Sequence, residues 1–313
     1  MQTMSSPRLS VVLPTRNRKA DLLRAARSVL SQTFRDLELV VVDEGSSDDT
    51  PDVLVRLREE DPRVRFVRND IAVGLPGARN CGIDAARGDL VAFCDDDDAW
   101  LPDAAQYLVE VFDRDPDVGV VSSWHEVLQV ESGRAVIYRA PLDIDEHLLL
   151  WMNFVGVPFG MYRRSAFDPD HRYDASLTKT SEDWDFWIRC AQQRPFRMVP
   201  RVCYLYRQHA GPRITTDPTR HAEGLLEIVA KHHDTMTPAC RAYHRCVADL
   251  LLDRRGSVVR RLAELARSSP ADAAFVALVL TASREASALG PRLRDPALTG
   301  RTMARLLRSP WAP

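Results

Sequence analysis

Short apolar runs alternate with helix-like stretches over the first hundred residues. The runs LSVVLP, LELVVVD, RVRFVRN and DLVAFC are separated by segments such as KADLLRAARSVLSQ and TPDVLVRLREED, in which apolar residues recur every three or four positions. The runs are rich in Val and Leu at consecutive positions, which is typical of strands covered on both faces. The order of strand, helix, strand and helix predicts an α/β fold with a mostly parallel sheet flanked by helices.

The pattern changes twice further along the chain. After residue 102 it predicts helices in LPDAAQYLVEVFDRDP, DEHLLLWMN and SEDWDFWIRCAQQ, strands in VGVVSSW, VPFGMYR and FRMVPRVCYLYR, and a hairpin around the turn Glu-Ser-Gly in VLQVESGRAVIY. From about Pro218 only helical segments rich in Ala, Leu and Arg follow. We therefore divide the chain into an α/β domain, 1–217, with halves at about 8–102 and 103–217, and a C-terminal helical region, 218–313.

Polar residues follow three of the early apolar runs. Thr15-Arg16-Asn17 follows the first run, Asp43-Glu44 follows the second, and Asp95 to Asp98 follow the third. The carboxyl ends of parallel strands lie along one edge of the sheet, where open α/β folds bind their ligands. These three groups are therefore expected to share one site.

The four consecutive carboxylates, Asp95 to Asp98, are unfavourable unless a positive charge lies among them. Oxygen ligands of this kind suit Mg²⁺ or Mn²⁺, with the remaining coordination positions going to water and substrate phosphates. Such a metal would hold a nucleotide diphosphate. The alternative is an Asp-rich turn before the helix that starts near Pro102, and Asp98 is the candidate for that role.

A glycine-containing segment, VGLPGARNCGIDAARGD, precedes the acidic run. Gly74, Gly77 and Gly82, together with Arg79 at a helix start, suit a phosphate or a backbone that is approached closely. The alternative interpretation of Arg79 is a solvated helix residue.

Five motifs in this order resemble glycosyltransferase family 2. They are SVVLPTRNR, SVLSQTF, LELVVVDEGSSDDT, ARNCGIDAARGDLVAFCDDDDAWLP and SEDWDFWIRC, and the match covers roughly residues 8 to 210. The resemblance implies the GT-A fold, a Rossmann-like sheet flanked by helices. It also implies inverting transfer of a sugar from a nucleotide-diphosphate donor to an acceptor hydroxyl, assisted by Mg²⁺ or Mn²⁺.

The resemblance also implies roles for residues of the donor half, 8–102. By this resemblance Asp97 occupies the metal-binding end of the Asp-x-Asp motif. Many relatives carry Asp-Asp where this chain has Asp43-Glu44, so the choice among UDP-, dTDP- and GDP-linked donors stays open. The nucleotide- and donor-binding candidates are Pro14, Thr15, Arg16, Asp43, Glu44, Arg79, Asp95, which is expected near the ribose, and Asp96, whose acidity has no explanation from the sequence.

The acceptor half, 103–217, has to supply the catalytic base. Inverting transfer needs a base on the face opposite the leaving diphosphate. Ser181 could cap a helix with Glu182 and Asp183 in its first turn, and the resemblance assigns the base to Asp183. The alternative is that these carboxylates only complement the helix dipole. Trp184 is a candidate acceptor contact, whereas Trp187 is expected in the core.

A loop near residue 210 adds cationic candidates. Arg207, His209 and Arg213 in YRQHAGPRITTD could approach the diphosphate. The family resemblance implies that a histidine near this position can bind the metal, which makes His209 a candidate metal ligand, although a lone histidine is more often structural. The pair His232-His233 cannot place both rings on one helix face, and we expect it at the surface.

Composition and charge limit the kinds of partner and the cellular compartment that we expect for this protein. The formal net charge of −2 gives no general attraction to nucleic acid, and the six scattered cysteines predict free thiols in a reducing compartment. The sequence shows neither a signal peptide nor an apolar run long enough to span a bilayer, so we expect a cytoplasmic protein. The basic tail segment RTMARLLRSPW is compatible with peripheral membrane contact, with docking onto the catalytic domain, or with a homo-oligomer interface.

Two other functions compete with glycosyl transfer. A sugar-phosphate nucleotidyltransferase usually carries a glycine-rich loop with a lysine after its first strand, whereas this chain has Pro-Thr-Arg-Asn-Arg there. A catalytically inactive nucleotide-sugar-binding module would not need the acidic motifs, and a turnover measurement separates it from an enzyme.

Overall fold

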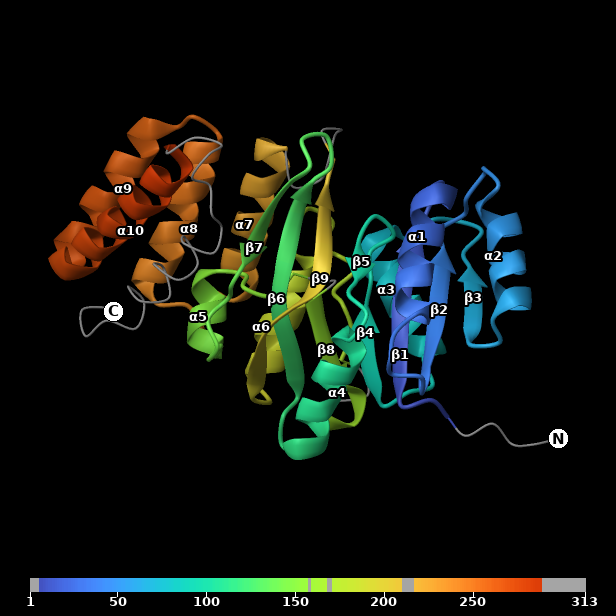
Figure 1. The fold of residues 1–313 in the computed structure, drawn as a ribbon. Helices are drawn as coiled ribbons and strands as arrows, with labels where there is room; N and C mark the ends of the chain where they lie inside the picture. The colour runs from blue at the N-terminus through green and yellow to red at the C-terminus, as the bar shows by residue number, and fades with distance from the viewer. Residues whose placement is uncertain (1–5, 157–158, 168–170, 210–216, 289–313) are drawn as a thin grey trace.

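A nine-stranded mixed sheet forms the centre of the described part of the molecule (Figure 1). The computed structural model describes residues 6–156, 159–167, 171–209 and 217–288. The strand order is β3-β2-β1-β4-β8-β6-β9-β5, with β7 paired to β6. Figure 1 shows the donor half at one end of this sheet and the C-terminal helices at the other.

The first half of the sheet follows the predicted alternation of strands and helices. Strands β3, β2, β1 and β4 are parallel neighbours, as the pattern predicts. The elements are β1 (Leu9–Thr15), α1 (Lys19–Leu30), β2 (Leu37–Asp43), α2 (Thr50–Glu60), β3 (Val64–Arg68), α3 (Gly74–Ala85), β4 (Leu90–Phe93) and β5 (Ala99–Trp100).

The second half is mostly antiparallel, which differs from the mostly parallel sheet expected from the sequence. Strand β8 is antiparallel to β4 and β6, β7 forms the predicted hairpin with β6, and β5 is antiparallel to β9. Only β9 runs parallel to its neighbour β6. The elements are α4 (Ala104–Arg114), β6 (Val120–Gln129), β7 (Arg134–Tyr138), α5 (Glu146–Trp151), β8 (Gly160–Arg163), α6 (Glu182–Ala191) and β9 (Phe196–Gln208).

Two apolar cores cover the two faces of the sheet. On one face, Leu13 and Val41 pack with α1, α2 and α4. On the other face, Val12 and Phe93 pack with α3, α5, α6 and the C-terminal helices in one continuous cluster. Because alternate residues of β1 enter different cores, burial on both faces explains its uninterrupted apolar sequence.

The C-terminal region is helical in the part that the structure describes, as predicted. Asp217 caps the first helix of this region by accepting from the backbone N–H groups of Thr219 and Arg220. Within the described residues, no helix combines the length and apolar character that crossing a bilayer requires. The helices are α7 (Pro218–Lys231), α8 (Pro238–Leu251), α9 (Arg255–Ser268) and α10 (Pro270–Ala288).

Two predictions about single residue types have different outcomes. The six cysteines are free thiols, and all except the partly exposed Cys81 are buried, as predicted. The surface location predicted for both histidines of the His232-His233 pair is wrong for His232. Its side chain is buried and its Nε2 lies 2.9 Å from Asp185 Oδ1, whereas His233 is exposed. A histidine in the last turn of an amphipathic helix can face inward when a buried carboxylate receives its N–H.

Candidate active site

The loops that follow β1 and β2 are bonded to each other at the carboxyl edge of the sheet. The backbone N–H of Glu44 donates to Thr15 O (3.0 Å), and the backbone N–H of Asn17 donates to Ser46 Oγ (2.9 Å). Asn17 has a positive φ of 54°, which asparagine tolerates better than most residues. Pro14 and Thr15 are buried at the end of β1, while Arg16 points its exposed side chain outward. The first two polar groups therefore form one connected surface, as predicted.

Asp43 and Glu44 shape this surface through internal hydrogen bonds. Asp43 is fully buried, and its carboxylate accepts from Ser46 N and from Arg68 Nη1. Glu44 accepts from the backbone N–H groups of Val73 and Gly74 at the start of α3 (2.9 and 3.0 Å). The longer Glu44 side chain thus spans from β2 to the start of α3.

Gly74 and Gly82 in α3 allow backbone positions that a residue with a side chain could not adopt easily. Gly74 has a φ of 79°, a backbone conformation that favours glycine. A Cβ on Gly82 would lie 2.2 Å from Val12 Cγ1, so this glycine lets α3 pack closely on β1. The close approach that the sequence suggested is therefore between a helix and a strand.

The acidic run alternates between partly exposed and buried side chains. Asp95 and Asp97 are partly exposed, with side-chain exposures of 27% and 25%. Asp96 and Asp98 are buried. This alternation leaves the two outer carboxylates of the Asp-x-Asp pattern available at the sheet edge and turns the other two inward.

Asp96, which the sequence left unexplained, holds the first loop in place. It accepts from Thr15 Oγ1 (2.8 Å) and from Arg18 Nη1 (3.0 Å). The same nitrogen of Arg18 also lies 2.8 Å from Asp97 Oδ2. Burial raises the pKa of Asp96 to about 6, although the Arg18 charge and the Thr15 hydroxyl oppose this shift.

Asp98 has a different role from the helix capping considered above. Helix α4 begins at Ala104, with Asp103 at its N-cap position. Asp98 instead accepts from the backbone N–H of Arg207 (3.0 Å), which joins the acidic run to β9. Burial and the neighbouring Asp95 charge raise the pKa of Asp98 well above its usual range. The interpretation as a helix cap is therefore wrong, because the Asp98 carboxylate accepts from the backbone of β9 and not from the first turn of α4.

Arg79 connects the donor and acceptor halves. Its side chain is almost fully buried, which excludes a solvated helix position. Nη2 donates to Asp95 Oδ1 (3.1 Å) and Nη1 donates to Glu182 Oε1 (2.9 Å). Burial by itself lowers the pKa of the guanidinium, but the charges of Asp95 and Glu182 raise it above its ordinary value. Arg79 stays charged and places the first turn of α6 beside the acidic run.

Asp183 lies in the first turn of α6, as predicted. Asn153 Nδ2 donates to its Oδ2 (3.2 Å), and the backbone N–H of Trp184 donates to its Oδ1 (2.7 Å). Burial of the carboxyl, together with the Glu182 charge, raises the pKa of Asp183 to about 7, although the Arg79 charge opposes this shift. Such a carboxylate can accept a proton near neutral pH, which a typical surface aspartate cannot do efficiently.

The proposed acceptor contact through Trp184 is wrong in this structure. Trp184 is only 7% exposed, and its indole N–H donates to Leu149 O. Its ring meets His244 edge to face, with centroids 5.2 Å apart. Trp187 is fully buried, as expected. Both rings pack in the core: Trp184 is covered by α5 and α8, and Trp187 packs against Gly160 of β8 and Phe196 of β9.

The cationic loop is described only in part. Arg213 lies outside the described residues. The Nε atom of Arg207 and the Nε2 atom of His209 are buried and have no hydrogen-bond partner among the described residues. Strand β9 is antiparallel to β5, with Leu205 opposite Ala99, so residues 207 to 209 continue alongside the acidic run. An unpartnered imidazole nitrogen at that position is available to a ligand.

These residues fit a divalent cation that is completed by substrate. Within the described ranges, no three His, Cys, Asp or Glu side chains cluster closely enough to hold a metal ion. A site of one carboxylate and one imidazole matches Mg²⁺ or Mn²⁺ chemistry in which phosphates and water supply the other ligands. The partly exposed Asp97 and the unpartnered His209 Nε2 are the candidates for those two ligands.

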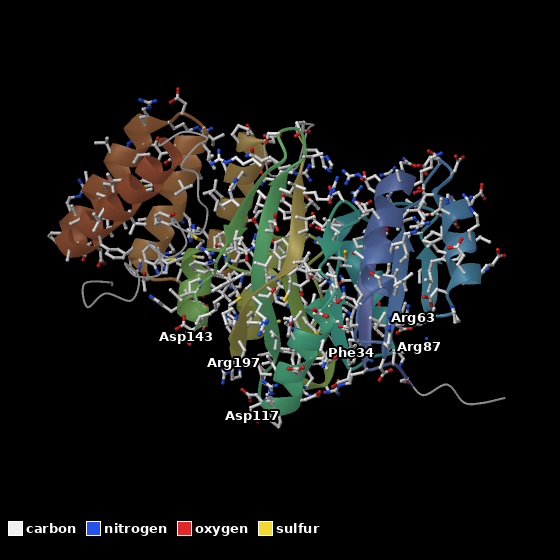
Figure 2. The ribbon with its side chains drawn as sticks, viewed as in Figure 1. Phe34, Arg63, Arg87, Asp117, Asp143 and Arg197 are labelled. Carbon is white, nitrogen blue, oxygen red and sulfur yellow. The ribbon has the colours of Figure 1, made fainter. Side chains whose placement is uncertain are left out.

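A surface hollow of about 420 Å³ lies away from this site. Asp143, Gln192 and Arg197 line it. Figure 2 shows Asp143 and Arg197 at the lower edge of the molecule, where Arg63 and Arg87 precede β3 and β4. The hollow therefore belongs to the amino-end edge of the sheet and not to the polar edge described above.

Three residues that contribute to the site were not predicted from the sequence. Arg18 pairs with Asp96 and Asp97, Arg68 pairs with Asp43, and Asn153 contacts Asp183. The signal for Arg18 was the second arginine of Pro-Thr-Arg-Asn-Arg. Asn153 carries no local signal, because only the tertiary fold brings the segment after α5 to α6.

A polar edge over parallel strands, a run of aspartates and a carboxylate on a later helix together favour an α/β protein that binds a nucleotide-sugar at the edge of its sheet. The family model for glycosyl transferase family 2 matches residues 10–169, just over half of the chain. The chain belongs to glycosyltransferase family 2. This membership favours glycosyl transfer over the nucleotidyltransferase interpretation.

Curated and solved relatives agree with this assignment. A GalNAc(5)-diNAcBac-PP-undecaprenol beta-1,3-glucosyltransferase of Campylobacter jejuni is 42% identical over 105 residues, which are 33% of this chain and 34% of that protein. The chain thus matches about a third of that relative's length.

Two solved structures share the fold. Staphylococcus aureus TarS 1-349, solved in complex with UDP-GlcNAc, has a TM-score of 0.64 at 17% identity and covers 96% of this chain and 91% of its own. The mannosyltransferase PcManGT from Pyrobaculum calidifontis, in complex with GDP-Man and Mn²⁺, has a TM-score of 0.62 at 20% identity and covers 97% and 86%. The GT-A fold expected from the sequence is therefore confirmed.

Proposed function

We propose that this protein performs an inverting, metal-assisted transfer of a sugar from a nucleotide-diphosphate donor to an acceptor hydroxyl, with Asp183 as the general base. The observation that carries the proposal is the Arg79 bridge. One guanidinium bonds Asp95 at the donor edge and Glu182, the neighbour of Asp183, on the acceptor side. The groups that would hold the donor and activate the acceptor therefore belong to one connected unit.

The donor would bind along the polar edge formed by the ends of β1, β2 and β4. The candidates there are Thr15, Arg16 and the loop shaped by Asp43 and Glu44, with Asp95 toward the ribose. Relatives of the same fold have been solved with UDP-GlcNAc and with GDP-Man, which supports a nucleotide-sugar donor without selecting its base.

Asp97 and His209 would hold a divalent cation together with the donor diphosphate. When bound, Mg²⁺ or Mn²⁺ supplies positive charge that stabilises the departing diphosphate. Arg18 lies beside Asp97 and adds cationic charge at the donor edge, whereas Arg207 reaches the acidic run through its backbone N–H, which donates to Asp98. The relative PcManGT, solved with Mn²⁺, is consistent with this choice of metal.

The chemical step is a single displacement at the anomeric carbon. Asp183 takes the proton of the acceptor hydroxyl while the acceptor oxygen forms its bond to the anomeric carbon. The bond from that carbon to the diphosphate oxygen breaks, and its electron pair leaves with the nucleoside diphosphate. One attack from the face opposite the leaving group inverts the anomeric configuration. Asn153 orients the base through its hydrogen bond to Oδ2.

A thermal-shift panel tests the donor part of the proposal. UDP-, dTDP- and GDP-sugars are added with and without Mn²⁺ to the wild type and to Asp97→Asn. A donor at about 100 times its Kd should stabilise the fold by about 2.7 kcal/mol. We expect one nucleotide class to raise Tm with Mn²⁺ in the wild type and much less in the variant. No shift with any nucleotide, or equal shifts in both proteins, would overturn the donor and metal assignments respectively.

Acceptor-dependent turnover tests the remainder. The donor identified by the panel is incubated with a mixture of hydroxyl acceptors, and nucleoside diphosphate and glycoside are quantified together. Equal amounts of both products are expected. Donor binding without turnover would instead favour the inactive binding module.

A further inference from the structure

Helix α7 lies directly against the segment that leads into α6. Arg220, near the start of α7, donates from Nε to Lys179 O (3.1 Å) and from Nη2 to Thr178 O (2.6 Å). A Cβ on the buried Gly224 would lie 2.4 Å from Thr180 Oγ1 and 2.6 Å from a second hydroxyl, that of Ser181. Glycine therefore permits an approach between α7 and this segment that no other residue allows without a shift.

Asp185 ties α6 to the far end of the same helix. This carboxylate is fully buried and accepts from Lys231 Nζ, His232 Nε2 and Arg189 Nε, each at 2.9 Å. Burial by itself raises the pKa of Asp185, but the three donors lower it below its ordinary value. Lys231 also reaches Asp174 Oδ2 (2.6 Å) in the segment before α6. Since a buried charge without partners is costly, α6 cannot leave the end of α7 easily.

Helix α8 supports the other partner of Asp183. Cys240 Sγ and His244 Nε2 both donate to Leu150 O (3.3 and 2.8 Å), near the end of α5. Burial lowers the pKa of His244 to about 4, so the imidazole is neutral at neutral pH and its Nε2 carries the proton. Leu150 lies three residues before Asn153, whose amide contacts Asp183. Figure 1 shows α7 and α8 standing beside α5 and α6 at this end of the sheet.

We propose that α7 and α8 are positioning elements of the catalytic centre, and that Gly224 and Arg220 place the carboxylate of Asp183 for the acceptor. The C-terminal helical region is then required for the chemical step and not only for stability. This inference rests on the proposed role of Asp183 as the base. It concerns the acceptor side alone, because the donor-edge residues described above make their hydrogen bonds within residues 15–98 and to Glu182 and Arg207.

The variant Gly224→Ala tests this proposal. Alanine favours a helix over glycine by about 1 kcal/mol, so α7 itself is not weakened and only the facing segment has to move. A displacement of about 1 Å at a reacting group lowers the rate by about 100-fold, so we expect kcat to fall about 10- to 100-fold. The donor Kd, measured by calorimetry, should stay within about twofold, since its contacts lie elsewhere.

The matched control is Gly256→Ala in α9, where a Cβ would meet nothing within 4 Å. It makes the same substitution in another C-terminal helix, and its kcat should equal that of the wild type. A similar loss of kcat in Gly256→Ala would overturn the proposal, because the effect would not depend on the contact with Thr180 and Ser181.

Arg220→Gln removes two hydrogen bonds without adding volume, and it keeps the test valid if Gly224→Ala does not fold. We expect a lower kcat, an unchanged donor Kd and an acid limb of the kcat/KM profile at lower pH. Loosening the segment admits water to the Asp183 carboxyl, which faces Glu182 and Arg79, and hydration lowers its pKa. A purely structural defect would scale the profile without moving it.

The outcomes separate this inference from the proposed function. A wild type that makes no glycoside contradicts the proposed function. A wild type that makes glycoside, with Gly224→Ala and Arg220→Gln matching its kcat, contradicts only the positioning role. Parallel losses of donor affinity and kcat in both variants also contradict it.

Discussion

The donor edge and the acceptor side use carboxylates in different ways. At the donor edge four aspartates stand in a row, and Arg18 and Arg79 supply cationic partners for three of them. On the acceptor side Asp183 keeps one amide partner and its own helix backbone. The first arrangement is suited to binding charge, and the second is suited to moving a proton.

The difference shows that position, more than residue type, determines what an aspartate can do. Asp97 is partly exposed beside an arginine, so it can exchange that cation for another one. Asp183 has no salt bridge among the described residues, and burial raises its pKa to about 7. Arg79 lies between the two regions and links them through its hydrogen bonds to Asp95 and Glu182.

Replacement of Asp183, the proposed base, should give the largest effect. Asp183→Asn keeps an oxygen for the Trp184 N–H but cannot take a proton, so kcat should fall by about 10²- to 10⁴-fold. Donor affinity should be retained, because the donor edge is untouched. Calorimetry and product quantification measure the two quantities. Asp117→Asn is the control, since Asp117 is exposed and Figure 2 shows it at the opposite, lower edge. Full activity of Asp183→Asn would contradict its role.

Removal of the Arg79 bridge should lower the stability of the protein, because this residue links the donor edge to the acceptor side. Arg79→Met leaves Asp95 and Glu182 without their shared cation, and losing one partner of a buried pair costs about 3–5 kcal/mol. Urea unfolding measures this loss. The control Arg114→Met removes an exposed pair with Glu110, which should cost at most about 1 kcal/mol. Equal stability of the two variants would show that Arg79 does not bridge the halves.

The smallest predicted effect concerns the donor edge alone. Thr15→Val removes the hydroxyl that donates to the buried Asp96, and a hydrogen bond to a charged group contributes about 1.5–3 kcal/mol. We expect this loss of stability and a higher KM for the donor, while kcat at saturation stays near wild type. Thr33→Val, at an exposed hydroxyl, should change neither quantity. A change in kcat alone would place Thr15 in the chemistry instead.

Much of the donor half could be predicted, because its signals are local. Apolar runs gave the parallel strands, and the rule that their carboxyl ends share an edge brought Thr15, Asp43 and Asp95 together. The antiparallel arrangement of β8 and β5 could not be predicted this way, since it depends on pairings between residues far apart in the sequence.

The acceptor side was less predictable, because its contacts come from packing. The helix with Glu182 and Asp183 was recognisable from its acidic first turn. Burial of Trp184 depends on α5 and α8, and burial of His232 depends on Asp185 across two helices. Neither contact leaves a periodic signal in the sequence. The inward turn of Asp96 likewise became clear only from its bonds to Thr15 and Arg18.

The pH dependence of kcat/KM tests the central claim, a base brought near neutrality by burial. Glu182 raises and Arg79 lowers the pKa of Asp183, while burial makes the largest contribution and brings it to about 7. Below that pH the carboxyl is protonated and cannot accept the acceptor proton. The rate should therefore fall about tenfold per pH unit on the acid side and level off above pH 7. A profile that is flat from about pH 5 to 8 would contradict the account.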